Sequence, residues 1–267
     1  MSAVSDAPAP TPAPVPQRRA VFGFRFALIN GGLAAVAAIA AVGLVVVLQQ
    51  PTKPKPPPWS SWRPASGSVT TMTKEIADHI APKYKATGKG TQLVAVIPGS
   101  PEVTKGTNET TVSTIGFLAS ASAQCCNRVI STKGNVQAQF CGLGTECSIS
   151  AGKPSAPRER LVRREALEMA LYTFKYVPGV DAVIAYLPPP AGQNPTSLLY
   201  LERSNLSKEL HQPLKQTLPL DKPPLPSLPD TKEKATIDRL TLPVLYSFQV
   251  QALQDGTEAL VLTPAAS

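Results

Sequence analysis

All four cysteines of the chain fall between positions 125 and 147, and thiols so close in sequence could do several kinds of chemistry. They are Cys125, Cys126, Cys141 and Cys147. Zinc sites usually carry ligand pairs about two to four residues apart, and thiol redox sites carry C-x-x-C. Neither spacing occurs here, and the two histidines, His79 and His211, lie far away in sequence. The spacing favours structural disulfides, with free buried thiols as the alternative.

The sequence excludes one of the three possible pairings of these cysteines and leaves the other two open. A bond between the adjacent Cys125 and Cys126 would close a strained ring, so we expect two crossing or nested bridges from this pair to Cys141 and Cys147. Each bridge would close a loop of roughly 15–23 residues and stabilise the fold by about 3 kcal/mol. Disulfides persist in oxidising compartments, which predicts that this region lies outside the cytoplasm.

Basic side chains gather at one place, in the stretch "PRERLVRRE" near the start of a predicted helix. The cluster consists of Arg158, Arg160, Arg163 and Arg164, with two glutamates among them. A solvated helix face with local ion pairs is the favoured interpretation; the functional hypothesis is a contact with anionic headgroups, a wall polymer or an acidic partner. No motif of serine hydrolases, zinc proteases or P-loop proteins stands in a suitable context. The sequence therefore assigns no catalytic, cofactor-binding or metal-ligating residue.

Composition narrows the possible partners. The 267 residues carry a net charge of +8, and only 6% of them are aromatic. The basic residues are dispersed and no nucleic-acid-binding motif occurs, so we expect no nucleic acid as a partner. The 29 prolines cluster outside the predicted strands and helices.

Residues 26–48, "FALINGGLAAVAAIAAVGLVVVL", contain no charged side chain and predict a transmembrane helix. At about 1.5 Å per residue the segment spans roughly 34 Å, enough to cross a hydrocarbon core of about 30 Å. A cleaved signal peptide would have a shorter apolar region and a small-residue cleavage site, so a retained signal-anchor is favoured. Basic residues flank both ends equally, and the cysteines must decide the orientation. We expect a cytoplasmic N-terminus.

The segments around this span differ in composition. Residues 1–25 predict a disordered, Pro/Ala-rich cytoplasmic tail, and residues 49–58 a polyproline stalk. Residues 59–267 are then one extracytoplasmic domain, for which pattern and turn signals predict the following elements. Helices are expected at 71–85, 156–177 and 205–218, the last weakened by Pro213, and strands at 91–99, 111–120, 180–188, 196–204, 246–253 and 259–263.

About seven strands and three helices without regular alternation predict an α+β fold: a mixed sheet with helices on one side, stapled by disulfides. The predicted function is binding or scaffolding at the cell envelope, as a single-pass subunit or accessory factor of a membrane assembly. An anchored envelope hydrolase is the alternative. The expected partners are the lipid bilayer and another envelope or membrane protein, and no cofactor is expected.

Overall fold

A computed structural model describes residues 31–33, 36–42, 57–85, 92–99, 112–149, 155–226, 233–254 and 256–265. The chain divides into two compact units, residues 1–56 and 57–267. In the first unit, residues 31–33 and 36–42 are helical; the expected tail and most of the expected span and stalk lie outside the described residues. Among the residues that are described, no helix has the length and apolar character needed to cross a bilayer.

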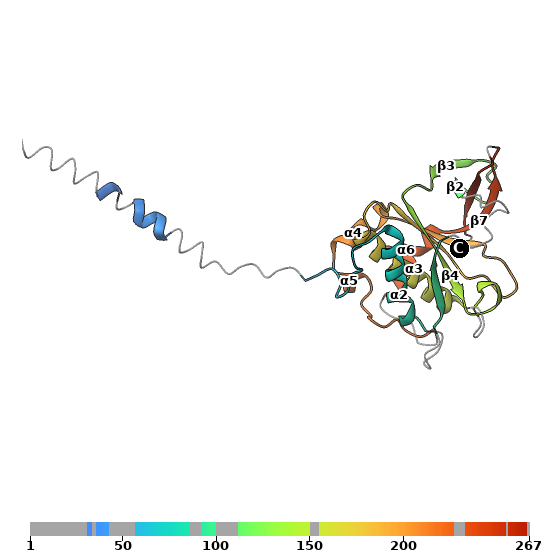
Figure 1. The fold of residues 1–267 in the computed structure, drawn as a ribbon, viewed down its shortest axis with the longest axis horizontal. Coiled ribbons are helices and arrows are strands. Elements are labelled where there is room, and N and C mark those ends of the chain that lie inside the picture. The colour runs from blue at the N-terminus through green and yellow to red at the C-terminus, as the bar shows by residue number, and fades with distance from the viewer. Residues whose placement is uncertain are drawn as a thin grey trace, which may run out of the picture. The chain divides into compact units, whose positions relative to one another are not determined.

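Eight strands in the described part of the chain form one mixed sheet (Figure 1). They are β1 (Val94–Pro98), β2 (Val112–Leu118), β3 (Cys126–Ser131), β4 (Asn135–Gly142), β5 (Ala182–Tyr186), β6 (Ser197–Glu202), β7 (Leu245–Ala252) and β8 (Glu258–Pro264). Their order in the sheet is β1-β4-β5-β6-β7-β8-β2-β3. Neighbours are antiparallel except for β4–β5 and β2–β8. The α+β class and the mixed sheet are confirmed. The sheet has eight described strands, where about seven were expected.

The sheet is strongly curled. β3 is the last strand in the order and β4 the second, yet only residues 132–134 connect them. Gly134 has φ +82° in this connection, and a Cβ there would lie 3.2 Å from the Asp181 carboxylate. Across the curl, Arg128 of β3 forms an ion pair with Glu202 of β6. The curl brings the β3 end of the sheet back toward its middle strands.

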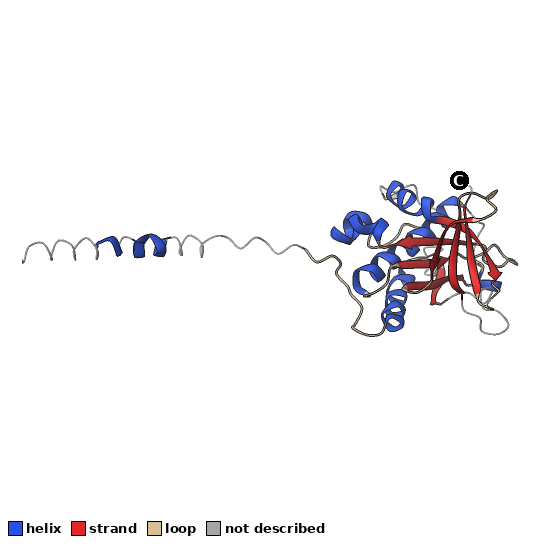
Figure 2. Ribbon diagram, turned by 90° about the horizontal axis from the view of Figure 1, so that it is seen from above, coloured by secondary structure: helices blue, strands red, loops and turns tan. Residues whose placement is uncertain are grey.

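Helices are gathered mainly on one side of the sheet (Figure 2). The α-helices of this unit are α2 (Val69–Ile80), α3 (Ala156–Tyr176), α4 (Ser207–His211), α5 (Leu214–Thr217) and α6 (Lys234–Thr241). Short 3-10 turns follow or separate them at η1 (Ala81–Lys83), η3 (Thr145–Cys147), η4 (Ser204–Leu206) and η5 (Leu242–Val244). Pro213 divides the expected helix 205–218 into α4 and α5, because its ring prevents continuation of the backbone hydrogen bonds.

Two apolar cores lie on the two faces of the sheet. β5 shows the separation: Val183 and Ala185 face the larger core under α2 and α3, whereas Ile184 and Tyr186 face the smaller core inside the curl. All five residues of β5 are buried, as in a central strand covered on both faces, and the expected strand at 180–188 is confirmed. α3 lies across the larger core, so its polar side chains must be accommodated in the interior.

The cysteine pairing differs from the expected one. Cys141 and Cys147 form a disulfide, and Cys125 and Cys126 are free, so the prediction of two bridges is wrong. β3 and β4 do not pair, and their connection lies between Ser131 and Asn135. Cys126 and Cys141 are therefore at the outer ends of two strands that lead away from each other. η3 instead folds the chain back onto the end of β4 and brings Cys147 to Cys141.

Candidate functional site

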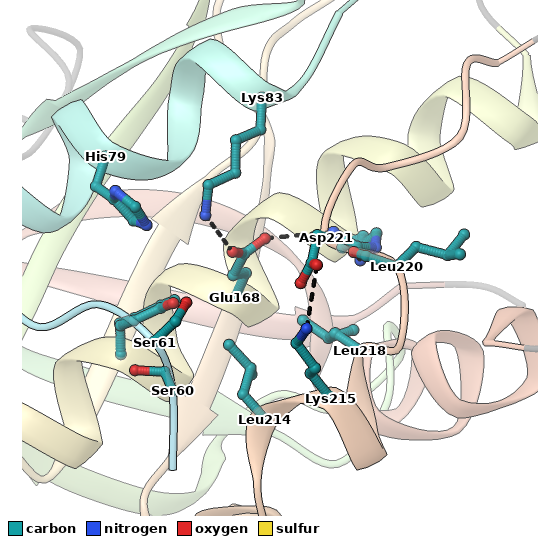
Figure 3. Close-up of a pocket in the computed structure, with 12 residues that line it drawn as sticks. Ser60, Ser61, His79, Lys83, Glu168, Leu214, Lys215, Leu218, Leu220 and Asp221 are labelled. Carbon is teal, nitrogen blue, oxygen red and sulfur yellow. Dashed lines mark hydrogen bonds and ion pairs between the residues drawn. The ribbon is translucent and has the colours of Figure 1, made fainter. Parts of the chain in front are cut away.

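A small cavity opens where residues 57–62, the entry segment of the 57–267 unit, meet α3 (Figure 3). Its volume is about 190 Å³. The lining side chains come from the entry segment, from α2 and η1, from α3, and from α5 with the loop after it: Ser60, Ser61, His79, Lys83, Arg164, Glu168, Tyr172, Leu214, Lys215, Leu218, Leu220 and Asp221. These segments are distant in sequence, and long-range contacts determine the shape of the cavity.

Arg164 lies at the inner wall of this cavity and is 1% exposed. Its Nε and Nη2 donate to the two carboxylate oxygens of Glu233 at 2.9 and 3.3 Å. Nη1 donates to the Tyr84 hydroxyl and to Glu168, and Nη2 also donates to the carbonyl of Leu220 at 2.7 Å. A buried guanidinium needs this many acceptors, because an unpaired charge in the interior would be strongly destabilising. The contacts join α3 to three other segments.

Glu168 follows Arg164 by one turn of α3 and is the central acceptor of the cavity. Lys83 Nζ donates to its Oε1 at 3.0 Å, and the Tyr84 hydroxyl donates to its Oε2 at 2.6 Å. Arg164 Nη1 lies 3.3 Å from the same Oε2. Burial raises the pKa of Tyr84 well above its usual value, and the nearby Glu168 charge raises it further, partly offset by Arg164. The phenol therefore stays a hydrogen-bond donor to Glu168.

Aromatic side chains form the wall next to the entry segment. Trp62 stacks on His79 with the ring centroids 3.9 Å apart and the planes 3° from parallel. Trp59 packs edge-on against Tyr172 and Tyr176, at 5.4 and 5.7 Å between centroids. Burial and the nearby Lys83 lower the pKa of His79, so its imidazole is neutral at neutral pH. The entry segment is thus part of the packed domain.

The four arginines of the predicted cluster do not share one surface. Arg163 and Arg164 are buried, and Arg163 Nη2 lies 2.9 Å from Asp238, to which Arg160 Nε also donates at 3.0 Å. Arg158 lines another cavity, of about 440 Å³, beside the proline run 188–190. Arg160 and Arg163 of α3 therefore share one carboxylate of α6, whereas Arg158 and Arg164 lie at two different cavities.

Sequence reasoning missed the acidic partners of these arginines. The spacing of Arg164 and Glu168 along α3 is that of a helical ion pair, so this contact was readable from the sequence. Glu233 and Asp238 lie 69 and 75–78 residues further along the chain than the arginines they meet, and no local signal connects them.

His211 lines a third cavity, of about 660 Å³, which includes Asp181 and Arg203.

Most polar groups of the cavity are engaged within the chain. The Ser60 hydroxyl contacts the Tyr176 hydroxyl at 2.7 Å and the backbone carbonyl of Trp62, neither of which is a base. Lys215 pairs with Asp221 at 3.2 Å. Within the described ranges, no group of three or more His, Cys, Asp or Glu is arranged to hold a metal ion. The geometry is that of a junction between segments, held together by ion pairs.

The fold and the cavity together define an α+β domain with a curled mixed sheet and a small polar cavity at its entry segment. Comparison of the chain with protein-family models, with curated proteins and with solved structures found no match.

Proposed function

We propose that this chain is a single-pass membrane protein whose 57–267 unit is an extracytoplasmic binding or scaffolding domain. It serves as a subunit or accessory factor of a cell-envelope assembly. Residues 26–48 are the signal-anchor, the tail before them is cytoplasmic, and residues 49–58 are the stalk. The bilayer and another envelope or membrane protein are its partners.

The apolar character of residues 26–48 supports the anchor. Among the described residues of this segment, Leu33, Val36, Ile39 and Val42 are 63–73% exposed. Large apolar side chains on a helix are unfavourable in water at such exposure, and a lipid environment would remove that cost. The disulfide between Cys141 and Cys147 supports the orientation, because such bonds persist outside the reducing cytoplasm.

One observation carries the choice of binding over catalysis: the charged side chains of the cavity are already paired with each other. Glu168 accepts hydrogen bonds from Lys83, Tyr84 and Arg164, so most of its acceptor positions are in use. A general base must reach a substrate proton with an open position. This pairing argues against the hydrolase alternative.

The edges of the sheet support a protein partner. Among the described strands, β1 and β3 are the two ends of the sheet, and each exposes a large apolar residue: Ile97 is 47% exposed and Val129 is 62% exposed. Unpaired strand edges present backbone donors and acceptors to other chains. A scaffolding role would use such edges.

The anchor and its orientation are tested on cells that produce the full-length chain. Alkaline carbonate should leave this chain in the membrane and should release a variant that lacks residues 1–56. A membrane-impermeant maleimide should label the exposed Cys125 on intact cells and leave a Cys125→Ser chain much less labelled. Release of the full-length chain by carbonate would contradict the anchor. Labelling only after cell lysis would contradict the orientation.

The binding role is tested by crosslinking in native membranes followed by affinity purification of the full-length chain. A stable envelope or membrane protein should co-purify, and should be lost when Val129→Glu or Ile97→Glu places a charge on an edge strand. A chain that co-purifies nothing, and that instead turns over model esters or amides, would favour the hydrolase.

A further inference from the structure

The Cys141–Cys147 disulfide lies on the same face of the sheet as the exposed Ile97 of β1. In the antiparallel register, Ile97 is opposite Gln139 of β4, and Ala95 is opposite Cys141. Residues directly opposite each other point to the same face, and so does every second residue along a strand. The Gln139 amide donates to Cys147 Sγ at 3.1 Å, so Cys147 contacts the residue that pairs with Ile97. The bond therefore borders the β1 edge.

The turn between the two cysteines is held mainly by contacts within itself. The Gly144 N–H donates to the Ser148 carbonyl at 2.7 Å. The Ser148 N–H and hydroxyl donate to the Thr145 carbonyl at 3.0 and 2.6 Å. The disulfide and the Gln139 hydrogen bond join the turn to β4, and both of these ties run through Cys147.

The closed turn has a backbone conformation that the disulfide maintains. Cys147 has φ +61°, in the left-handed region that residues other than glycine adopt only at a cost. The returning chain also lies directly on the end of β4, where a Cβ on Gly142 would be 2.0 Å from the Ser148 carbonyl oxygen. Without the bond, Cys147 can return to an ordinary φ and the chain can move away from Gly142.

The bond can open while the domain stays folded. A loop with a sequence separation of 6 removes little entropy from the unfolded chain, so the bond contributes little to global stability. Both cysteines are half-buried, which leaves the bond accessible to a thiolate from solvent. Leu143, within the turn, is 54% exposed. Opening the bond would therefore move an apolar side chain at the surface.

We propose that this disulfide is a redox switch that sets the shape of the surface beside β1; the proposal rests on the proposed binding role of that edge. A protein dithiol opens the bond. One of its thiolates attacks a sulfur of the disulfide, and the other cysteine leaves as a thiolate and takes up a proton. The second thiol of the dithiol then displaces the first cysteine. Two electrons pass to the chain, and the products are two cysteine thiols and an oxidised dithiol.

Hydrogen exchange on the purified full-length chain tests the switch without a partner. Dithiothreitol is added without denaturant, and alkylation with peptide mapping identifies the thiols. Cys141 and Cys147 should both become alkylated. The amides of Gly144 and Ser148 should exchange about tenfold faster, and those of β7 and β8 should not change. A bond that is reduced only in urea, or exchange at the turn that reduction leaves unchanged, would overturn the proposal.

Matched variants connect the switch to binding in native membranes. The double variant Cys141→Ala, Cys147→Ala is permanently open and should lose most of the crosslinked partner with or without dithiothreitol. The double variant Cys125→Ser, Cys126→Ser keeps the bond and removes the free thiols, so it should lose the partner only after reduction, as the wild type does. Equal recovery of the partner by the open variant and the wild type would overturn the switch and leave the binding role intact. Recovery of no partner by any of these chains would contradict the binding role itself, and with it the switch.

Discussion

Glu165 on α3 allows a sharp test of the interior electrostatics. Its side chain is 0% exposed, and neither carboxylate oxygen has a hydrogen-bond partner among the described residues. Burial raises the pKa of this carboxyl well above its ordinary value of 4.5; the Glu168 charge raises it further, and Arg164 partly offsets the increase. The folded chain therefore keeps the Glu165 proton at pH values where the unfolded chain has released it.

The sign of the pH dependence follows from this difference. Below pH 4.5 both states are protonated, and the carboxyl does not favour unfolding. Above that pH the unfolded state releases its proton, and the free energy of unfolding falls by up to about 1.4 kcal/mol per pH unit. The loss continues until the pH reaches the raised pKa of the folded state. Glu165 thus lowers the stability of the domain as the solution becomes neutral.

Glu165→Gln removes the titration while keeping the shape of the side chain. The variant should match the wild type near pH 4 and become more stable than it by up to about 1.4 kcal/mol for each pH unit above 4.5, until the folded-state pKa is reached. Glu165→Leu also removes the buried polar atoms, and should add about 1–3 kcal/mol of stability beyond Glu165→Gln.

Urea unfolding of the full-length chain at a series of pH values measures these differences. Glu159→Gln is the matched control, because Glu159 lies on the same helix with its side chain 49% exposed. It removes the same charge from the same helix at a solvent-accessible position, and should not stabilise the domain at neutral pH. A Glu165→Gln effect that is the same at every pH would refute the reasoning, since it would mean that the folded state does not retain the proton.

Three further predictions concern the positions that hold the site and the turn. Arg164→Met leaves the Glu233 carboxylate buried without its ion-pair partner and should destabilise the domain by about 3–5 kcal/mol in urea unfolding. Gly142→Ala places a Cβ 2.0 Å from the Ser148 carbonyl oxygen and should prevent the turn from closing, seen as a loss of the disulfide in non-reducing peptide mapping. Cys141→Ser opens a loop with a sequence separation of 6 and should cost about 2 kcal/mol in chemical unfolding.

Local pattern predicted the elements well where one periodicity dominates. The expected helix 156–177 is α3, with its apolar stripe in the core, and the expected pair of strands at 246–253 and 259–263 is the antiparallel pair β7–β8. β4 was missed, although "NVQAQFCG" alternates buried and partly buried residues along its length. The same segment alternates polar and apolar residues from Asn135 to Phe140, which is a strand signal.

Sheet order and side-chain partners could not be predicted in the same way. A three-residue connection between two strands usually predicts a hairpin, yet β3 and β4 pair with other strands. The adjacent cysteines were expected to bridge to Cys141 and Cys147 because sequence alone does not show that their strands diverge. The arginine cluster was expected at the surface because charge near a helix start is usually solvated. Two of its members are buried because their carboxylate partners arrive from α6 and from the residue before it.

The ion pairs on α3 explain how the cavity keeps a defined shape. Apolar packing is not directional, so the core under α3 would tolerate several placements of the segments around it. A guanidinium has donors in a fixed planar arrangement, and Arg164 uses them on partners 80, 69 and 56 residues away in the sequence. Those partners lie after η1, before α6 and in the loop after α5. Because the first and last of these segments also line the cavity, we interpret Arg164 as the residue that fixes Lys83 and Lys215 on opposite sides of Glu168.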